Sequence, residues 1–215
     1  MAIIPADEKV FMVSNSTNTI YGGSAALQAM QQWYTMQDIS DSVVVTAPYK
    51  VFTALLTQSG GDDVQNLSSG AVTKGVTYQI SGVGFDCTNV GAPNNDNGTY
   101  FVAINNEVPT NYGAGSLTYN VGAPVVNVLE NTIGNIWWEY QQVGGYLIKS
   151  DALFTENKTI LFASSMNNGN DTNNHTATGY TNTDELSFRS WGNTGDNYAE
   201  LDNTIPLPIE IRVYN

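Results

Sequence analysis

The side chains that could carry out chemistry are few and far apart in this sequence. Its 215 residues include one histidine, His175, and one cysteine, Cys87. His175 lies in an asparagine-rich stretch, whereas a catalytic histidine needs a fixed position and a partner that orients its ring. The apolar neighbours of Cys87 predict a small buried side chain rather than a reactive thiol. A single cysteine also excludes an intrachain disulfide and a cysteine-based zinc cluster.

Acidic residues lie close together in the sequence at three places, where paired carboxylates could act as acid and base. The pairs are Asp38 with Asp41, Asp62 with Asp63, and Asp184 with Glu185. A glycoside hydrolase holds two carboxylates about 5–10 Å apart across a sugar-binding cleft. The spacing selects none of the three pairs. We therefore predict no catalytic residue, and an enzyme that degrades polysaccharide stays open only as a third hypothesis.

Two asparagine-rich stretches offer oxygen atoms that a calcium ion could use. They are residues 94–98 (NNDNG) and 167–171 (NNGND). Neither has the Asp-x-Asp-x-Asp-Gly spacing of a dedicated calcium loop, and turns alone favour Asn and Gly. We therefore expect turns at these places, with no metal and no cofactor.

Tryptophan and tyrosine are the residues best suited to contact a partner. The sequence has 4 Trp and 12 Tyr, and both types are enriched at protein interfaces. Trp137 and Trp138 are adjacent on a predicted strand, so one points to each side of the sheet and at most one can lie in its core. The candidate interface or glycan-stacking aromatics are Trp137, Trp138 and Trp191.

The charge of the chain limits its partners. The net charge is −13, and there are only 7 Lys and Arg residues, whereas a nucleic-acid surface needs clustered basic residues. Hydrophobic residues make up 41% and charged residues 13%, which predicts a folded core under neutral polar groups. Neither an apolar run of about 18 residues nor an export leader is recognisable. We expect no nucleic acid and no membrane among the partners.

The first 42 residues are predicted to be an arm followed by one short helix. Ser24 is suited to cap a helix over residues 25–37. So short a helix is not stable alone, and its apolar face must pack on the following sheet or on the same helix of a neighbouring subunit. The candidate oligomer or anchor contacts are Val10, Phe11, Leu27, Met30, Trp33 and Tyr34.

The rest of the chain is predicted to be mainly β, with antiparallel sandwich-like modules, one nested in another. Short apolar or alternating segments recur between turns rich in Gly, Asn and Pro. We expect one β module split between residues 43–63 and 122–165, and a small β module inserted at 64–121. In the last part, 166–215, an exposed loop over 166–179 should precede strands at 185–191 and 207–214 that close one sheet together.

Segments of the split module resemble a known family. They are residues 49–60 (YKVFTALLTQSG), 122–134 (GAPVVNVLENTIG) and 154–162 (FTENKTILF). They resemble a β-rich module of structural proteins from tailed bacteriophages, especially those of Bacteroidetes and marine hosts. Residues 75–103 resemble a second small phage β module, which usually has phenylalanine where Cys87 stands here. With the N-terminal segment, the likeness covers residues 1–165.

The resemblance implies a non-enzymatic virion structural protein, made in the cytoplasm of the bacterial host. We expect a capsid-attached head fibre or decoration protein that assembles as a homo-oligomer, with a trimer favoured. Its N-terminal part would anchor it to other virion proteins such as the capsid. The alternative is a tail-fibre or receptor-binding protein that recognises host surface glycans.

Overall fold

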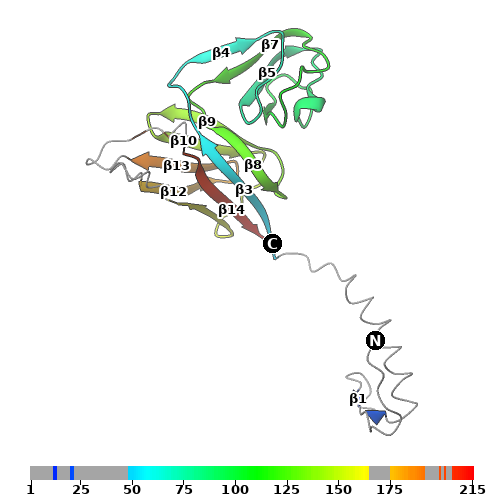
Figure 1. The fold of residues 1–215 in the computed structure, drawn as a ribbon, viewed down its shortest axis with the longest axis vertical. Helices are drawn as coiled ribbons and strands as arrows, with labels where there is room; N and C mark the ends of the chain where they lie inside the picture. Colours follow the sequence, from blue (N-terminus) through cyan, green and yellow to red (C-terminus); the bar gives the residue numbers. More distant parts are fainter. Residues whose placement is uncertain are drawn as a thin grey trace. The chain divides into compact units, whose positions relative to one another are not determined.

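The chain divides into two units, residues 1–47 and 48–215. The computed structural model (Figure 1) describes residues 12–13, 20–21, 48–164, 175–191, 199, 201 and 205–215. In the first unit, β1 (Met12–Val13) pairs antiparallel with β2 (Ile20–Tyr21). The expected helix over 25–37 and residues 43–47 of the expected split module lie outside the described residues. So do the candidate contacts Val10, Phe11, Leu27, Met30, Trp33 and Tyr34.

The second unit is built from antiparallel strands, which confirms the predicted mainly β class. The strands are β3 (Tyr49–Thr57), β4 (Val64–Leu67), β5 (Thr77–Val83), β6 (Tyr100–Val102), β7 (Ala114–Asn120), β8 (Val125–Asn131), β9 (Ile136–Gln142), β10 (Gly145–Ser150), β11 (Thr159–Ala163), β12 (His175–Asn182), β13 (Glu185–Trp191) and β14 (Leu207–Tyr214). A 3-10 turn, η1 (Thr88–Val90), lies between β5 and β6.

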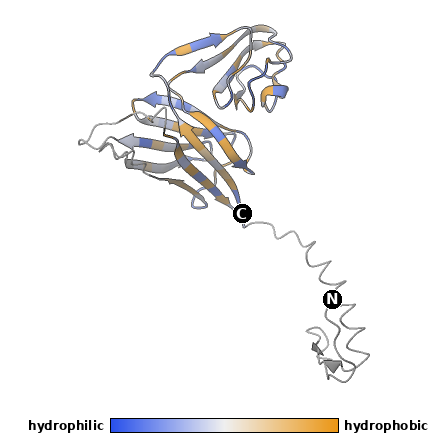
Figure 2. Ribbon diagram, viewed as in Figure 1, coloured by the Kyte–Doolittle hydropathy of each residue, from blue (hydrophilic) through white to orange (hydrophobic). Residues whose placement is uncertain are grey.

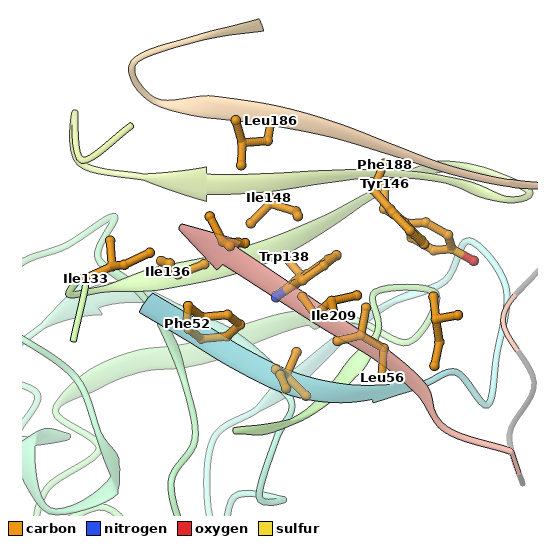
Figure 3. Packing of buried hydrophobic residues seen from close by; sticks show 14 of the residues in the cluster. Phe52, Leu56, Ile133, Ile136, Trp138, Tyr146, Ile148, Leu186, Phe188 and Ile209 are labelled. Carbon is orange, nitrogen blue, oxygen red and sulfur yellow. The ribbon is translucent and has the colours of Figure 1, made fainter. Parts of the chain in front are cut away.

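Two four-stranded sheets form a sandwich around one hydrophobic core. Their strand orders are β12-β13-β10-β9 and β11-β14-β3-β8. Hydrophobic and hydrophilic residues occur in the same strands (Figure 2), because alternate side chains point to opposite faces. In β14, for example, Ile209, Ile211 and Val213 are buried. They join Phe52 and Leu56 of β3 in the core, opposite β10 and β13 (Figure 3).

Two expectations for the last part of the chain were wrong. The strands at 185–191 and 207–214 do not close one sheet together, because β13 belongs to one sheet of the sandwich and β14 to the other. The stretch that begins at His175 is not loop but β12, whose backbone pairs with β13 from Trp191 to Glu185. β12 and β13 are consecutive antiparallel strands that form a hairpin, so pairing with the next strand along the chain stabilises this stretch despite its polar composition.

The nested module is inserted between β3 and β8, which are neighbours in one sheet. We call residues 64–121 the insert. Its four strands form a third sheet in the order β4-β7-β5-β6. It has its own core, in which Tyr78, Ile80, Phe101 and Leu117 pack around Cys87. The nesting of one sandwich-like module in another is as the sequence predicts, and β4 is a strand that the sequence pattern did not reveal.

Close backbone approach explains two glycines of the insert. Gly82 of β5 lies opposite Gly115 of β7 in the strand register, and both have positive φ angles, 147° and 149°. A Cβ atom on Gly82 would lie 2.2 Å from the Ala114 carbonyl oxygen, and one on Gly115 would lie 2.1 Å from the Ser81 carbonyl oxygen. Only glycine allows this strand pair to form.

Polar residues of segments 49–60 and 122–134 fix turns and buried contacts of the sandwich. The buried Gln58 side chain accepts hydrogen bonds from the Tyr146 hydroxyl and the Leu201 N–H, and it donates to the Gly60 carbonyl at 2.7 Å. Asn131 closes the turn after β8 by accepting from the Ile133 N–H at 3.0 Å and donating to the Gly134 carbonyl at 2.7 Å. Gln58 and Asn131 therefore have structural roles.

Candidate functional site

The adjacent tryptophans of β9 point to opposite sides of their sheet. Trp138 enters the sandwich core, where it is 1% exposed and meets the Phe188 ring edge-on at 6.2 Å. Trp137 is 8% exposed and stacks on Tyr100 of β6, with ring centroids 5.5 Å apart and ring planes 7° apart. The Tyr100–Trp137 stack thus joins the insert to the sandwich.

Hydrogen bonds extend this junction on both sides of the stack. The Asn135 side-chain amide donates to the Tyr100 carbonyl at 2.9 Å, and the Trp138 N–H donates to the Thr77 hydroxyl at 3.2 Å. At the other sheet, the Val126 N–H donates to the Gly75 carbonyl at 2.8 Å. The insert therefore covers edge strands of both sandwich sheets, β9 and β8, which would otherwise expose unpaired backbone groups.

Two clefts open beside the stack, and Tyr100 lines both. The first, which we call the asparagine cleft, has a volume of about 270 Å³. Its lining residues are Pro93, Asn94, Asn97, Gly98, Thr99, Tyr100, Asn135, Trp137 and Asp151. The second, the tyrosine cleft, has a volume of about 330 Å³ and includes Tyr119, Tyr140, Gln79 and Glu139 in its lining. Aromatic rings beside a few fixed polar groups are typical of small-molecule sites.

Backbone groups fix the side-chain amides of the asparagine cleft. The Asn94 side-chain oxygen accepts from the Asp96 N–H at 3.0 Å and from the Thr99 hydroxyl. The Asn97 side-chain oxygen accepts from the Gly82 N–H at 2.8 Å. The local bonds of Asn94 support the expected turn over residues 94–98, whereas the bond from Gly82 ties Asn97 to β5. Both side-chain oxygens are thus occupied, and each amide nitrogen points away from the bonded N–H.

The electrostatic surroundings of the stack are asymmetric. Burial raises the pKa of Tyr100, and the negative charge of Glu139 raises it further, so this phenol stays neutral at physiological pH. Lys149 lies on β10, the strand that pairs with β9. Its hydrogen bond of 2.8 Å to Glu185 raises its pKa, which keeps the lysine charged. Asp151 lines the asparagine cleft, and its carboxylate has no hydrogen-bond or ion-pair partner within the described parts of the chain.

The three tryptophans that the sequence analysis selected lie in different surroundings in the structure. Trp138 is a core residue and presents no surface to a sugar, because the sandwich encloses it. Trp137 reaches the asparagine cleft only beside its stacking partner. Trp191 is half-buried at the end of β13, away from both clefts as their linings show. The three tryptophans therefore do not form one aromatic surface.

The described acidic neighbours occupy structural positions. Asp62 accepts from the Asn120 amide at 2.9 Å, and Asp184 accepts from the Ala152 N–H at 2.7 Å. Asp38 and Asp41 lie outside the described residues, as does the side chain of His175. Within the described ranges, no three His, Cys, Asp or Glu side chains gather as metal ligands would, and no helix is long and apolar enough to cross a membrane.

The sequence interpretation missed the residues that line the asparagine cleft. Tyr100, Asn135 and Asp151 come from three separate turns or strands, and only the fold brings them together. The one usable signal is the NNDNG stretch at 94–98, for which the sequence predicts a turn rather than a calcium loop. No protein-family model, curated protein or solved structure matches the chain.

Proposed function

We propose that this protein is a non-enzymatic structural protein of a tailed-bacteriophage virion, specifically a capsid-attached head fibre or decoration protein that forms a homo-oligomer. The observation that carries the proposal is the position of the phage-like segments. Residues 49–60 and 122–134 contain β3 and β8, which pair along one sheet. Two segments that carry the resemblance are therefore far apart in the sequence but adjacent in one sheet.

Immunogold electron microscopy on intact phage particles tests the location. With antibody raised against the whole chain, we expect label over the head, because a head fibre or decoration protein is displayed on the capsid exterior. Label at the tail end would instead favour a receptor-binding protein. Particles that carry no label anywhere would contradict both virion-surface roles.

One face of the sandwich has the composition of an association surface. On the outer side of β11, Ile160 and Phe162 are 41% and 46% exposed. The Arg212 guanidinium lies 4.8 Å from the Tyr49 ring centroid and 5.4 Å from that of Phe162. Exposed apolar groups beside Tyr and Arg are characteristic of protein interfaces. We assign the subunit contacts of the described part to this face.

Replacing Ile160 with lysine is expected to weaken self-association at least tenfold, because Ile160 lies opposite Arg212 in the strand register and a second positive charge there would be buried at the interface without a partner of opposite sign. Sedimentation velocity of the purified chain would show the oligomer shifting toward monomer. The matched control is Ile104→Lys, which alters an isoleucine that is 60% exposed on the insert. Equal sedimentation of the two variants would contradict the assignment of this face.

A second function, recognition of host surface glycans by a receptor-binding protein, has one specific observation in its favour. The two clefts beside the Tyr100–Trp137 stack combine aromatic residues with side-chain amides and carboxylates. These are groups that contact the apolar and polar parts of a sugar. This candidate differs from the first in needing an open site rather than a covered face.

A further inference from the structure

The asparagine cleft presents hydrogen-bonding groups that the protein itself leaves unused. The side-chain nitrogens of Asn94 and Asn97, the side-chain oxygen of Asn135 and the carboxylate of Asp151 have no partner among the described residues. We propose that this cleft binds a neutral saccharide. The inference names a site and a ligand class for the second candidate function and rests on that function.

The first argument is the mixture of donors and acceptors. Asn94 and Asn97 offer N–H donors, whereas Asn135 and Asp151 offer oxygen acceptors. Every sugar hydroxyl both donates and accepts, so neighbouring hydroxyls need donors and acceptors close together. A phosphate or carboxylate ligand would instead need donors alone.

The second argument is that these groups are held in place before any ligand arrives. Asn97 is anchored to the Gly82 N–H at 2.8 Å, and Asn135 is anchored to the Tyr100 carbonyl at 2.9 Å. Each amide therefore presents its other polar atom in a set direction. Side chains that are already ordered lose less conformational entropy on binding than mobile ones do.

Charge selects the kind of sugar. The lining of the cleft contains the acidic residue Asp151 and no lysine or arginine, and the chain as a whole has a net charge of −13. A sialylated, phosphorylated or uronic-acid glycan would meet repulsion without a compensating cation. A neutral sugar avoids this cost, and it can still donate hydroxyl protons to the Asp151 carboxylate.

The size of the cleft suits a small ligand. Its volume of about 270 Å³ lies just below the range for drug-sized ligand sites, roughly 300–1,000 Å³. This leaves room for the end of an oligosaccharide rather than for a long buried chain. Tyr100 lines the cleft and is half-buried, so its ring is the one that can contact the C–H groups of a pyranose, while Trp137 is 8% exposed and stacks on that ring.

The test begins with the full chain on a printed array that carries neutral and anionic oligosaccharides. We expect binding to one or more neutral sugars, and calorimetry with the best of them gives the dissociation constant. Asp151→Ala is expected to weaken binding about 10- to 100-fold, which is the loss of one hydrogen bond to a charged acceptor. Asp151→Arg is expected to abolish binding, because the longer side chain fills the cleft.

The matched controls are Glu156→Ala and Glu156→Arg, which change an exposed acidic residue outside the cleft lining. Both should bind as the unaltered chain does, and circular dichroism should show the same fold for all four variants. Three results would each overturn the proposal: no binding to any sugar on the array, a preference for anionic sugars, or unchanged affinity in Asp151→Arg. Since the array uses isolated protein, its failure leaves the immunogold result on virion location unaffected.

Discussion

Trp138→Ala is expected to lower the free energy of unfolding by about 3–5 kcal/mol, as large-to-small replacements of buried aromatic residues do. The side chain is fully enclosed between the two sandwich sheets and packs edge-on against Phe188. Its removal leaves a cavity that β-sheets on both sides cannot easily fill. Denaturant unfolding followed by circular dichroism measures the loss.

Trp138→Phe should be far milder, within about 1 kcal/mol of the unaltered chain. The Trp138 indole N–H is buried and has no acceptor among the described residues. Phenylalanine loses some packing but also removes this unpaired donor, so the two effects offset each other. A phenylalanine variant as unstable as the alanine variant would contradict this offset, because the loss from replacing the indole would then outweigh the removal of the unpaired donor.

Phe101→Ala is expected to open the insert without opening the sandwich to the same extent. Phe101 is fully buried in the core that surrounds Cys87. Loss of about 3–5 kcal/mol from that core should raise the rate of Cys87 alkylation under native conditions by at least about 10²-fold, because a buried thiol reacts only when its surroundings open. The readout is labelling by iodoacetamide, followed by mass spectrometry.

The sandwich offers a matched control for this experiment. Phe188→Ala removes a fully buried phenylalanine from the other core, so it should lower the stability of the sandwich while changing Cys87 labelling much less. If both variants changed both readouts equally, the insert and the sandwich would unfold as one cooperative unit. That result would contradict the view that the two cores unfold as separate units.

The Cys87 thiol also makes the stability of the insert depend on pH. Burial raises the pKa of Cys87 from 9.0 to about 11, and the nearby charge of Asp86 adds to the shift. Below pH 9 the thiol is protonated in both the folded and the unfolded insert, so its contribution is constant. Between pH 9 and 11 only the unfolded form ionises readily, and the insert should lose stability across that window. The same labelling, corrected for the reactivity of a free thiol, would reveal it.

Local pattern was sufficient to predict much of the fold. The alternation in residues 207–214 placed Ile209, Ile211 and Val213 on one face, and all three are buried. The alternation in residues 185–191 did the same for Leu186 and Phe188. Side-chain direction follows from a period of two residues, which is a local property of a strand.

Strand partners and the cleft were beyond the reach of the sequence pattern. The pairing of β14 with β3 joins the end of the chain to residue 49, and no local signal specifies such a partner. The asparagine cleft depends in the same way on three turns and strands that meet only after folding. The asparagine content was informative about turns, since Asn94 and Asn131 each accept from the backbone N–H two residues further along the chain. The asparagine content gave no indication of which side-chain amides keep an oxygen or nitrogen atom without a hydrogen bond.

The nesting of the insert between β3 and β8 also bears on the order in which the chain folds. These two strands must find each other although β3 ends at Thr57 and β8 begins at Val125, and closing a longer loop costs more chain entropy. In the folded insert the two ends meet, because Val64 pairs with Asn120 and the Val121 N–H donates to the Asp63 carbonyl at 3.0 Å. If the insert forms early, the long loop between β3 and β8 therefore behaves as a short connection. In the folding route with the lowest entropy cost, the insert forms first and β3 then pairs with β8.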